Sequence, residues 1–180
     1  MVADPIKLVC DLYRSYTEIT SKDETLDRFY GWGQLLLADF DDIDKNMADA
    51  HKVFANLRDI HELDDIDYLS PEQKNILKSF FHNFADDHLS KLKERFLSLW
   101  CNLEEIYRDF NQRLAAQGLA YEGALYRRVV EAQADYEFDK YVFVGFNMLQ
   151  QVEQRLFLTL KAQGKACFYW DFDHYYLANN

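Results

Sequence analysis

Apolar residues recur every three or four positions over most of the chain, and this spacing predicts amphipathic helices. Asp4 followed by a proline predicts the start of the first helix. The Asp4 carboxylate can accept hydrogen bonds from free backbone N–H groups of the first turn, and proline fits the first helical position because it has no N–H that needs an acceptor. Ser21 and Glu24 have the spacing of a capping box, which predicts the start of a second helix. Within that helix, Gly31 and Gly33 are expected to let a neighbouring backbone approach closely.

The same start and stop patterns predict further helices. Ser70 and Pro71 predict a helix start of the same kind as the first. The longest apolar stripe runs over residues 89–117, and Gly118 follows where a C-terminal cap belongs. A shorter helix is predicted over residues 121–134. We therefore expect a mainly α fold with a helical bundle over residues 1–135.

The pattern changes in the last part of the chain. Residues 141–144 and 166–170 are short β-branched and aromatic runs, typical of buried strands. A helix predicted over residues 148–163 separates them, and a strand–helix–strand order predicts a parallel pair. Two parallel strands alone make a poor sheet, so we expect residues 136–180 to be a βαβ remnant of a larger parallel sheet.

Composition narrows the function classes. Acidic residues outnumber basic ones by 31 to 20, which gives a net charge of −11 and makes the chain a poor partner for nucleic acid or an anionic membrane. The acidic run over residues 39–67 is expected to form solvated helix faces. Cys10, Cys101 and Cys167 are far apart and odd in number, typical of reduced thiols. No apolar stretch has membrane-spanning length and the first residues do not resemble a signal peptide, so we expect a cytoplasmic protein.

Few residues form patterns that carry chemistry. The chain has no phosphate-binding glycine loop, no dinucleotide fingerprint and no nucleophile elbow. One metal-like cluster comprises His82, Asp86, Asp87 and His88. A solvated helix end is the simpler interpretation of that cluster. Asp171, Asp173 and His174 follow the second predicted strand, at the end where α/β proteins place ligands, although a loop-ordering role fits them equally well.

Four segments in order resemble a known family. Residues 118–126, Gly-Leu-Ala-Tyr-Glu-Gly-Ala-Leu-Tyr, are similar to a Gly-x-x-Asp-Phe-x-Asp-Leu-Leu element of superfamily 1 helicases of the RecB and UvrD type. Residues 142–154 resemble their Walker B segment, and residues 169–176 resemble the strand with the Gly-Asp-x-x-Gln-Ser motif that follows. Residues 29–44 resemble a segment in the N-terminal helicase-like region of AddB-type nuclease subunits of the Bacteroidetes type.

The departures from that family imply an inactive member. Val144, Gly145 and Phe146 stand at the Walker B position, where active helicases carry an Asp-Glu pair that holds Mg²⁺ and activates water. His174 replaces the motif III glutamine, beside Asp171 and Asp173. The resemblance implies a degenerate helicase domain of the AddB/RecC kind, with residues 1–135 akin to helicase subdomain 1B and residues 136–180 to a remnant of subdomain 1A.

The implied role is scaffolding in DNA double-strand-break repair and recombination. We expect no catalytic residue, metal or cofactor in this segment and no membrane contact. The expected partner is a helicase/nuclease subunit, and DNA is expected to bind only to the full-length protein. The candidate DNA contacts are Lys91, Lys93, Arg95, Arg127 and Arg128.

Two other interpretations remain. The chain fits a stand-alone helical protein-interaction module, with an accidental likeness to helicases. A metal-dependent hydrolase that uses His82, Asp171 and Asp173 is the third alternative. A piece of a larger sheet would leave strand edges bare, and for that reason we also expect the isolated chain to self-associate.

Overall fold

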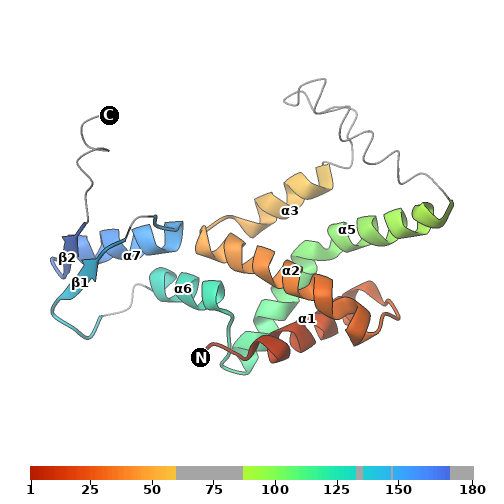
Figure 1. Ribbon diagram of the computed structural model, residues 1–180, viewed down its shortest axis with the longest axis horizontal. Helices are drawn as coiled ribbons and strands as arrows, with labels where there is room; N and C mark the ends of the chain where they lie inside the picture. The colour runs from red at the N-terminus through yellow and green to blue at the C-terminus, as the bar shows by residue number, and fades with distance from the viewer. Residues whose placement is uncertain (60–86, 133–135, 147, 171–180) are drawn as a thin grey trace, which may run out of the picture. The chain divides into compact units, whose positions relative to one another are not determined.

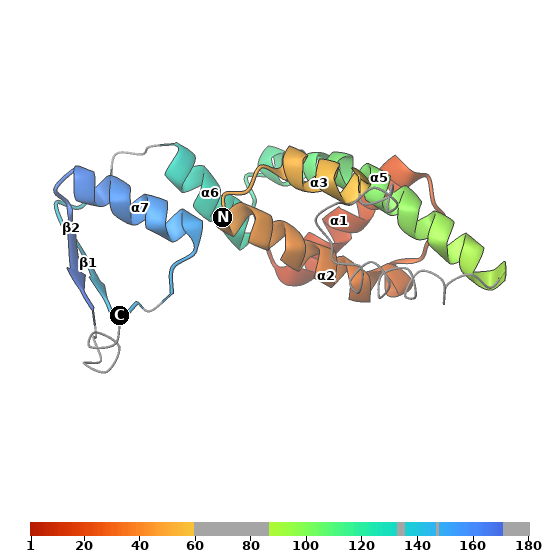
Figure 2. The same cartoon turned by 90° about the horizontal axis from the view of Figure 1, so that it is seen from above.

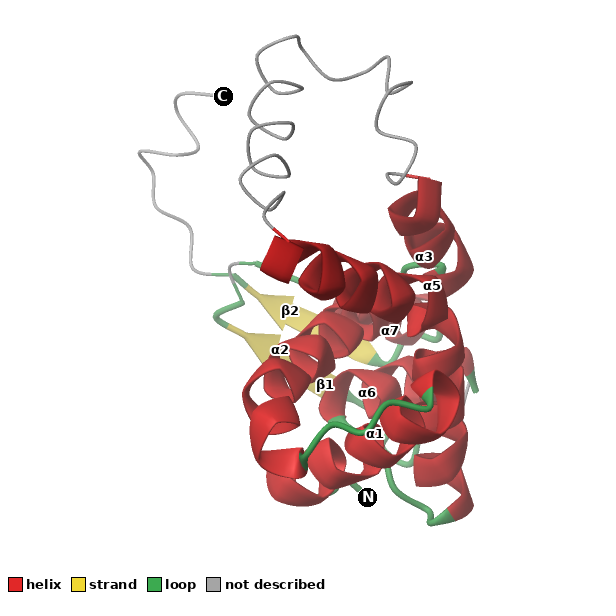
Figure 3. Ribbon diagram, turned by 90° about the vertical axis from the view of Figure 1, so that its right-hand side faces the viewer, coloured by secondary structure: helices red, strands yellow, loops and turns green. Residues whose placement is uncertain are grey.

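The structure is a computed structural model that describes residues 1–59, 87–132, 136–146 and 148–170, with side chains except at 56–59 and 87–100. Figure 3 shows that helices make up most of the described chain, which confirms the predicted mainly α class. No described helix is both long enough and apolar enough to cross a membrane. In chain order the elements are α1 (Pro5–Thr20), α2 (Leu26–Lys45), α3 (Ala50–Asp59), α5 (Asp87–Ala116), α6 (Glu122–Glu131), β1 (Tyr141–Val144), α7 (Gln151–Ala162) and β2 (Ala166–Tyr169).

The chain divides into two compact units. The helical unit comprises residues 4–37 and 49–118, and the sheet unit comprises residues 1–3, 38–48 and 119–180. Helix α2 contributes its first part to the helical unit and its last part to the sheet unit. The domain boundary predicted between residues 135 and 136 stays a prediction.

In the helical unit, α1 and α3 both pack against the long helix α5 (Figures 1 and 2). In the described part of the predicted α5 stripe, Ile106, Phe110 and Leu114 are fully shielded from solvent, and Tyr107 is half-buried. In α1, the side chains of Leu8, Val9, Leu12 and Tyr16 are buried, whereas Ile6 in the first turn is exposed. Helical spacing therefore identifies the buried face of both helices, and within the described residues the exposed position in α1 is at its end.

The start of α2 differs from the prediction. Ser21 has a left-handed backbone with φ 51° and ends α1, so the capping box predicted from Ser21 and Glu24 is wrong. The carbonyl of Thr25 accepts the N–H of Phe29 in the first turn of α2. The Thr25 hydroxyl also bonds the carboxylate of Asp27 and holds its pKa below the ordinary value. Glu24 instead accepts a hydrogen bond from the Tyr16 hydroxyl at 3.0 Å.

An aromatic cluster joins α1 to the first part of α2. The Phe29 ring is fully buried and contacts Tyr13, Tyr16 and Trp32, with ring centroids 4.2 to 5.3 Å apart. The same ring lies where a side chain at Gly33 would project. The backbone approach expected at Gly31 and Gly33 is therefore wrong for the described residues: Gly33 makes room for the Phe29 ring of its own helix, and nothing lies close to Gly31.

In the sheet unit, β1, α7 and β2 form the predicted strand–helix–strand motif. The strands are parallel, with Val142 opposite Cys167 and Val144 opposite Tyr169. Gln150 and Glu153 form a capping box that starts α7. The helix predicted from Ser70 and Pro71 lies outside the described residues.

Candidate functional site

The first candidate site is the carboxyl end of β1, where α/β proteins usually place ligand-binding residues. Strand β1 ends at Val144, and the N–H of Gly145 donates to the Tyr169 carbonyl at 3.1 Å, which extends the ladder by one bond. The Phe146 ring turns back against Phe143 and Phe157, with centroids 6.3 and 5.4 Å apart. The strand end thus presents an isopropyl group, a bare glycine and a phenyl ring.

The backbone at Gly145 is specific to glycine. Its φ of 75° lies in the left-handed region, and no heavy atom lies within 4 Å of the place that a Cβ would occupy. Space is therefore available there, and the backbone angle, rather than crowding, favours glycine. Val144, Gly145 and Phe146 carry no side-chain oxygen or nitrogen, so these three side chains neither ligate Mg²⁺ nor activate water.

The other predicted chemical clusters lie outside what the structure describes. This applies to Asp171, Asp173 and His174, and equally to His82 and Asp86. Asp87 and His88 are in the first turn of α5, but their side chains are not described. Within the described residues, no group of three or more His, Cys, Asp or Glu side chains could hold a metal ion. Both metal hypotheses stay predictions.

The second candidate site is a buried ionic junction between the last turns of α2 and helix α6. Asp44 is 1% exposed and accepts hydrogen bonds from the Tyr121 hydroxyl and, at 3.2 Å, from the Arg127 guanidinium. Arg127 also donates to the Ala48 carbonyl at 2.8 Å and to Glu131 at 2.9 Å. A buried carboxylate requires such pairing, because an unpaired charge away from water is costly.

A second row of contacts extends this junction. The N–H of Gly123 donates to the Asp41 carboxylate at 2.6 Å, and a Cβ at Gly123 would lie 2.5 Å from the Asp41 carbonyl oxygen. Only glycine permits this approach. Lys45 bridges Asp41 at 2.7 Å and Glu122 at 3.1 Å. The Tyr126 hydroxyl and then the Lys45 ammonium hold the pKa of Glu122 below its ordinary value.

The junction brings together two segments that carry the helicase resemblance, residues 29–44 and 118–126. It also corrects the expectation that the acidic run from residue 39 is solvated, because Asp44 is buried there. The sequence contains one hint, a Tyr-x-Gly pattern followed by adjacent arginines at 127 and 128, but it does not identify the carboxylate that they meet.

The candidate DNA contacts have different surroundings. Arg127 is held by two carboxylates of the same unit, whereas Arg128 is exposed and donates to the Leu119 carbonyl at 3.2 Å. The side chains of Lys91, Lys93 and Arg95 are not described, although their backbone lies in α5. DNA contact by these five residues stays a prediction.

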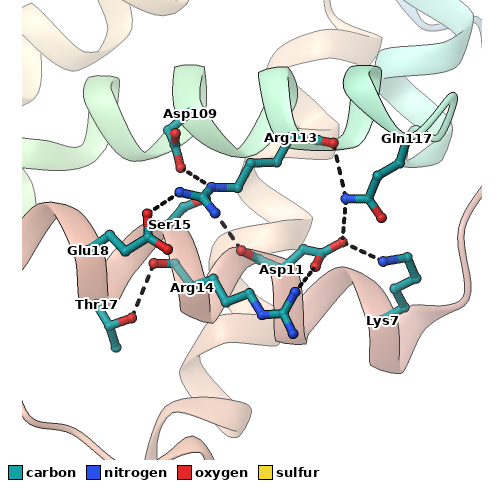
Figure 4. A network of polar contacts seen from close by, with 9 residues as sticks. All are labelled: Lys7, Asp11, Arg14, Ser15, Thr17, Glu18, Asp109, Arg113 and Gln117. Carbon is teal, nitrogen blue, oxygen red and sulfur yellow. Dashed lines mark hydrogen bonds and ion pairs between the residues drawn. The ribbon is translucent and has the colours of Figure 1, made fainter.

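A third polar network lies between α1 and α5, within the helical unit (Figure 4). Asp11 is 3% exposed and meets Lys7 at 2.9 Å, Arg14 at 3.5 Å and Gln117 at 3.3 Å. A neighbouring arginine, Arg113, pairs with Asp109 of its own helix and reaches across to Glu18 of α1. These charges are balanced within the network, so its evident role is to fix α1 on α5.

No family model, curated protein or solved structure matches this chain.

Proposed function

We propose that this chain is a non-catalytic, helicase-like scaffold segment of an AddB-like helicase/nuclease subunit in DNA double-strand-break repair and recombination. The observation that carries the proposal is the end of β1. There, a parallel strand–helix–strand unit has the order expected of a helicase core. Its first strand, β1, ends in Val144 and is followed by Gly145, where an active helicase carries two acids.

The chemistry of that strand end supports a role without catalysis. ATP hydrolysis by helicases needs one carboxylate near Mg²⁺ and a second that activates water. Val144 and Gly145 supply neither, and the left-handed backbone at Gly145 is unfavourable for a longer side chain. We therefore propose that the segment acts through its fold, by holding other parts of the helicase/nuclease complex in position.

The ionic junction gives independent support. The two resembling segments, residues 29–44 and 118–126, lie far apart in the sequence, yet Asp44 and Tyr121 meet across 77 positions. This meeting fits a fold in which the two resembling segments belong to one structural unit.

The charge of the chain directs the scaffold role towards protein partners. With a net charge of −11, the segment repels the phosphate backbone at long range. We therefore assign it to docking a helicase/nuclease partner subunit and to shaping a DNA path that is lined by other parts of the full-length protein.

The test is genetic and biochemical. Deleting the gene in its source organism should sensitise cells to ionising radiation, and a wild-type copy should restore survival. A Val144→Ala copy should restore survival equally, because the side chain at this position has no chemical role in the proposal. The affinity-tagged protein should also copurify with a helicase-type ATPase. Normal survival of the deletion strain, without ATPase copurification, would contradict the proposal.

A second candidate function is a stand-alone protein-interaction module. One observation favours it: Val142, Val144 and Tyr169 are 60%, 66% and 59% exposed on one face of the strand pair. An interaction module with no part in repair should leave radiation survival unchanged in the deletion strain, while the protein still binds a partner through that face.

A further inference from the structure

Helix α6 is too short to be stable by itself. It has ten residues, and isolated helices shorter than about 12–15 residues are marginal in water. Its N-cap residue, Tyr121, makes no side-chain hydrogen bond to the free N–H groups of the first turn, so the usual local cap is missing. The formation of α6 therefore depends on contacts with other parts of the chain.

Apolar packing gives α6 only a small anchor. Every residue of α6 is described, and among their side chains only those of Ala124 and Val130 are both apolar and buried. Helix α7, which α6 contacts, buries the larger set Val152, Phe157 and Leu160. Because stabilisation by burial grows with the apolar area that is removed from water, α6 gains much less from burial than α7 does.

Charged groups at the end of α2 supply the contacts that α6 needs. The Asp41 carboxylate accepts the Gly123 N–H at 2.6 Å, so a residue 82 positions away acts as the missing N-cap. Its negative charge also suits the positive end of the α6 dipole. Further along α6, Arg127 donates to the Asp44 carboxylate at 3.2 Å and to the Ala48 carbonyl at 2.8 Å. Helix α6 is thus held mainly by polar contacts with the last turns of α2 and the turn that follows.

Helix α7 provides the contrast within the same unit. It has twelve residues and its own capping box, in which the N–H of Gln150 donates to the Glu153 carboxylate at 2.8 Å. Helix α7 therefore begins with a local cap, whereas the cap of α6 comes from another helix. Elements with few buried apolar contacts are the ones that open at low free energy while the rest of a domain stays folded.

We infer that α6 (residues 122–131) is a detachable strap. It is helical while Asp41 and Asp44 hold it, and it opens as one unit while α7 and the strand pair stay folded. Opening exposes the Asp44 carboxylate, which is 1% exposed in the closed state. The inference goes beyond the proposed function, because it concerns a conformational equilibrium of the chain by itself and does not depend on the resemblance to helicases.

Hydrogen exchange of the full chain, followed by mass spectrometry, tests the strap. In the wild type, the protection of the α6 amides should be at least about tenfold lower than that of the α7 amides. Asp41→Ala should lower the protection of α6 by about a further tenfold, since it removes a hydrogen bond to a charged group, and should leave α7 unchanged. Asp41 lies outside the measured segment, so the intrinsic exchange rates of α6 stay the same.

Two further variants control for side effects of the substitution. Asp42→Ala is the matched control, because Asp42 is the next residue of α2 and is exposed, and it should leave the protection of α6 unchanged. Asp41→Asn keeps an oxygen that accepts the Gly123 N–H, so it should lower the protection of α6 less than Asp41→Ala does. Carbodiimide labelling should modify Asp44 faster in Asp41→Ala than in Asp42→Ala.

Three outcomes would overturn the inference. The first is equal protection of α6 and α7 in the wild type, and the second is an equal effect of Asp41→Ala and Asp42→Ala on α6. The third is a loss of protection in α7 as large as that in α6 for both Asp41 variants, because the sheet unit would then open as a whole.

Discussion

Two glycines of α2, Gly31 and Gly33, have different surroundings. A Cβ at Gly31 meets no atom within 4 Å, whereas a Cβ at Gly33 would overlap the buried ring of Phe29. The ring cannot move aside easily, because Tyr13, Tyr16 and Trp32 enclose it. The same residue type is therefore a steric requirement at one position and a helix-weakening choice at the other.

This difference predicts opposite signs for two alanine substitutions. Gly33→Ala should lower the free energy of unfolding by about 1–3 kcal/mol, the usual effect of overpacking a core. Gly31→Ala should raise it by about 0.5–1 kcal/mol, since alanine restricts the unfolded chain and favours the helix. Urea denaturation followed by circular dichroism measures both. Equal changes in the free energy of unfolding for the two substitutions would show that the Phe29 ring moves aside to accommodate the new methyl group.

Adjacent arginines provide a second comparison at this scale. Arg127→Met leaves the buried Asp44 carboxylate without its cation and should cost about 2–4 kcal/mol of stability. Arg128→Met removes an exposed side chain that donates to one backbone carbonyl, and should cost less than about 1 kcal/mol. Chemical denaturation at neutral pH measures the difference. A similar cost for both arginines would rule out Asp44 as the main reason for the effect.

At the scale of elements, local patterns located most of the fold. The β-branched runs at 141–144 and 166–170 predicted both strands, and the long stripe over 89–117 predicted α5 within two residues at each end. Each of these elements has its own sequence pattern. The start of α2 was placed wrongly because Ser21 and Thr25 both fit a capping position, and the left-handed turn at Ser21 decides between them.

The candidate sites also differ in how far a local sequence pattern predicts them. The short β-branched run predicts that β1 ends at Val144, whereas the Walker B position assigned to Val144 and Gly145 comes from the family resemblance and stays a prediction. The ionic junction was missed, because Asp41, Asp44 and Lys45 meet residues 121–127 only after the chain folds back. A single sequence does not distinguish a buried aspartate from the solvated ones beside it.

The docking of α6 has a pH dependence that can be tested. The Tyr126 hydroxyl and Lys45 lower the pKa of Glu122, so its contribution to stability is complete above the ordinary glutamate pKa and is lost as the pH falls through the lowered value. The effect should stay below about 1 kcal/mol, because the side chain is half exposed.

The variant Glu122→Gln should therefore be less stable than wild type near neutral pH, and the two should converge in acid. Urea midpoints across an acidic pH series measure this convergence. Glu105→Gln, at an exposed position of α5, is the control and should show no such trend. A difference between wild type and Glu122→Gln that persists at the lowest pH would mean that the carboxylate charge is not its source.

At the scale of the whole molecule, we predict that the chain neither binds nor hydrolyses ATP. Val144, Gly145 and Phe146 at the end of β1 carry no carboxylate, and the sequence contains no phosphate-binding loop. Calorimetry with ATP and Mg²⁺ should show no heat of binding at micromolar concentrations. Phosphate release should equal that of a mock preparation. Measurable turnover would contradict both the prediction and the scaffold role.

The net charge of −11 predicts weak binding to DNA. The dissociation constant at physiological salt should be no tighter than about 10⁻⁴ M for duplex or single strands. A gel shift at low micromolar protein in that salt would reveal a basic surface that outweighs the overall charge. Arg128→Glu would then test whether the exposed arginine belongs to that surface.

The sequence separation between Asp44 and Arg127 also affects the order of folding during synthesis. The two residues are 83 positions apart, so a ribosome that adds about 5–20 residues per second releases Asp44 some 4–17 s before its cation. During that interval the carboxylate must stay hydrated, because burying it alone is costly. The end of α2 therefore cannot reach its final state in the nascent chain until α6 has left the exit tunnel. Synthesis of α6 thus sets the earliest moment at which the junction around Asp44 can form, and slower translation before α6 would prolong the time that this carboxylate spends in water.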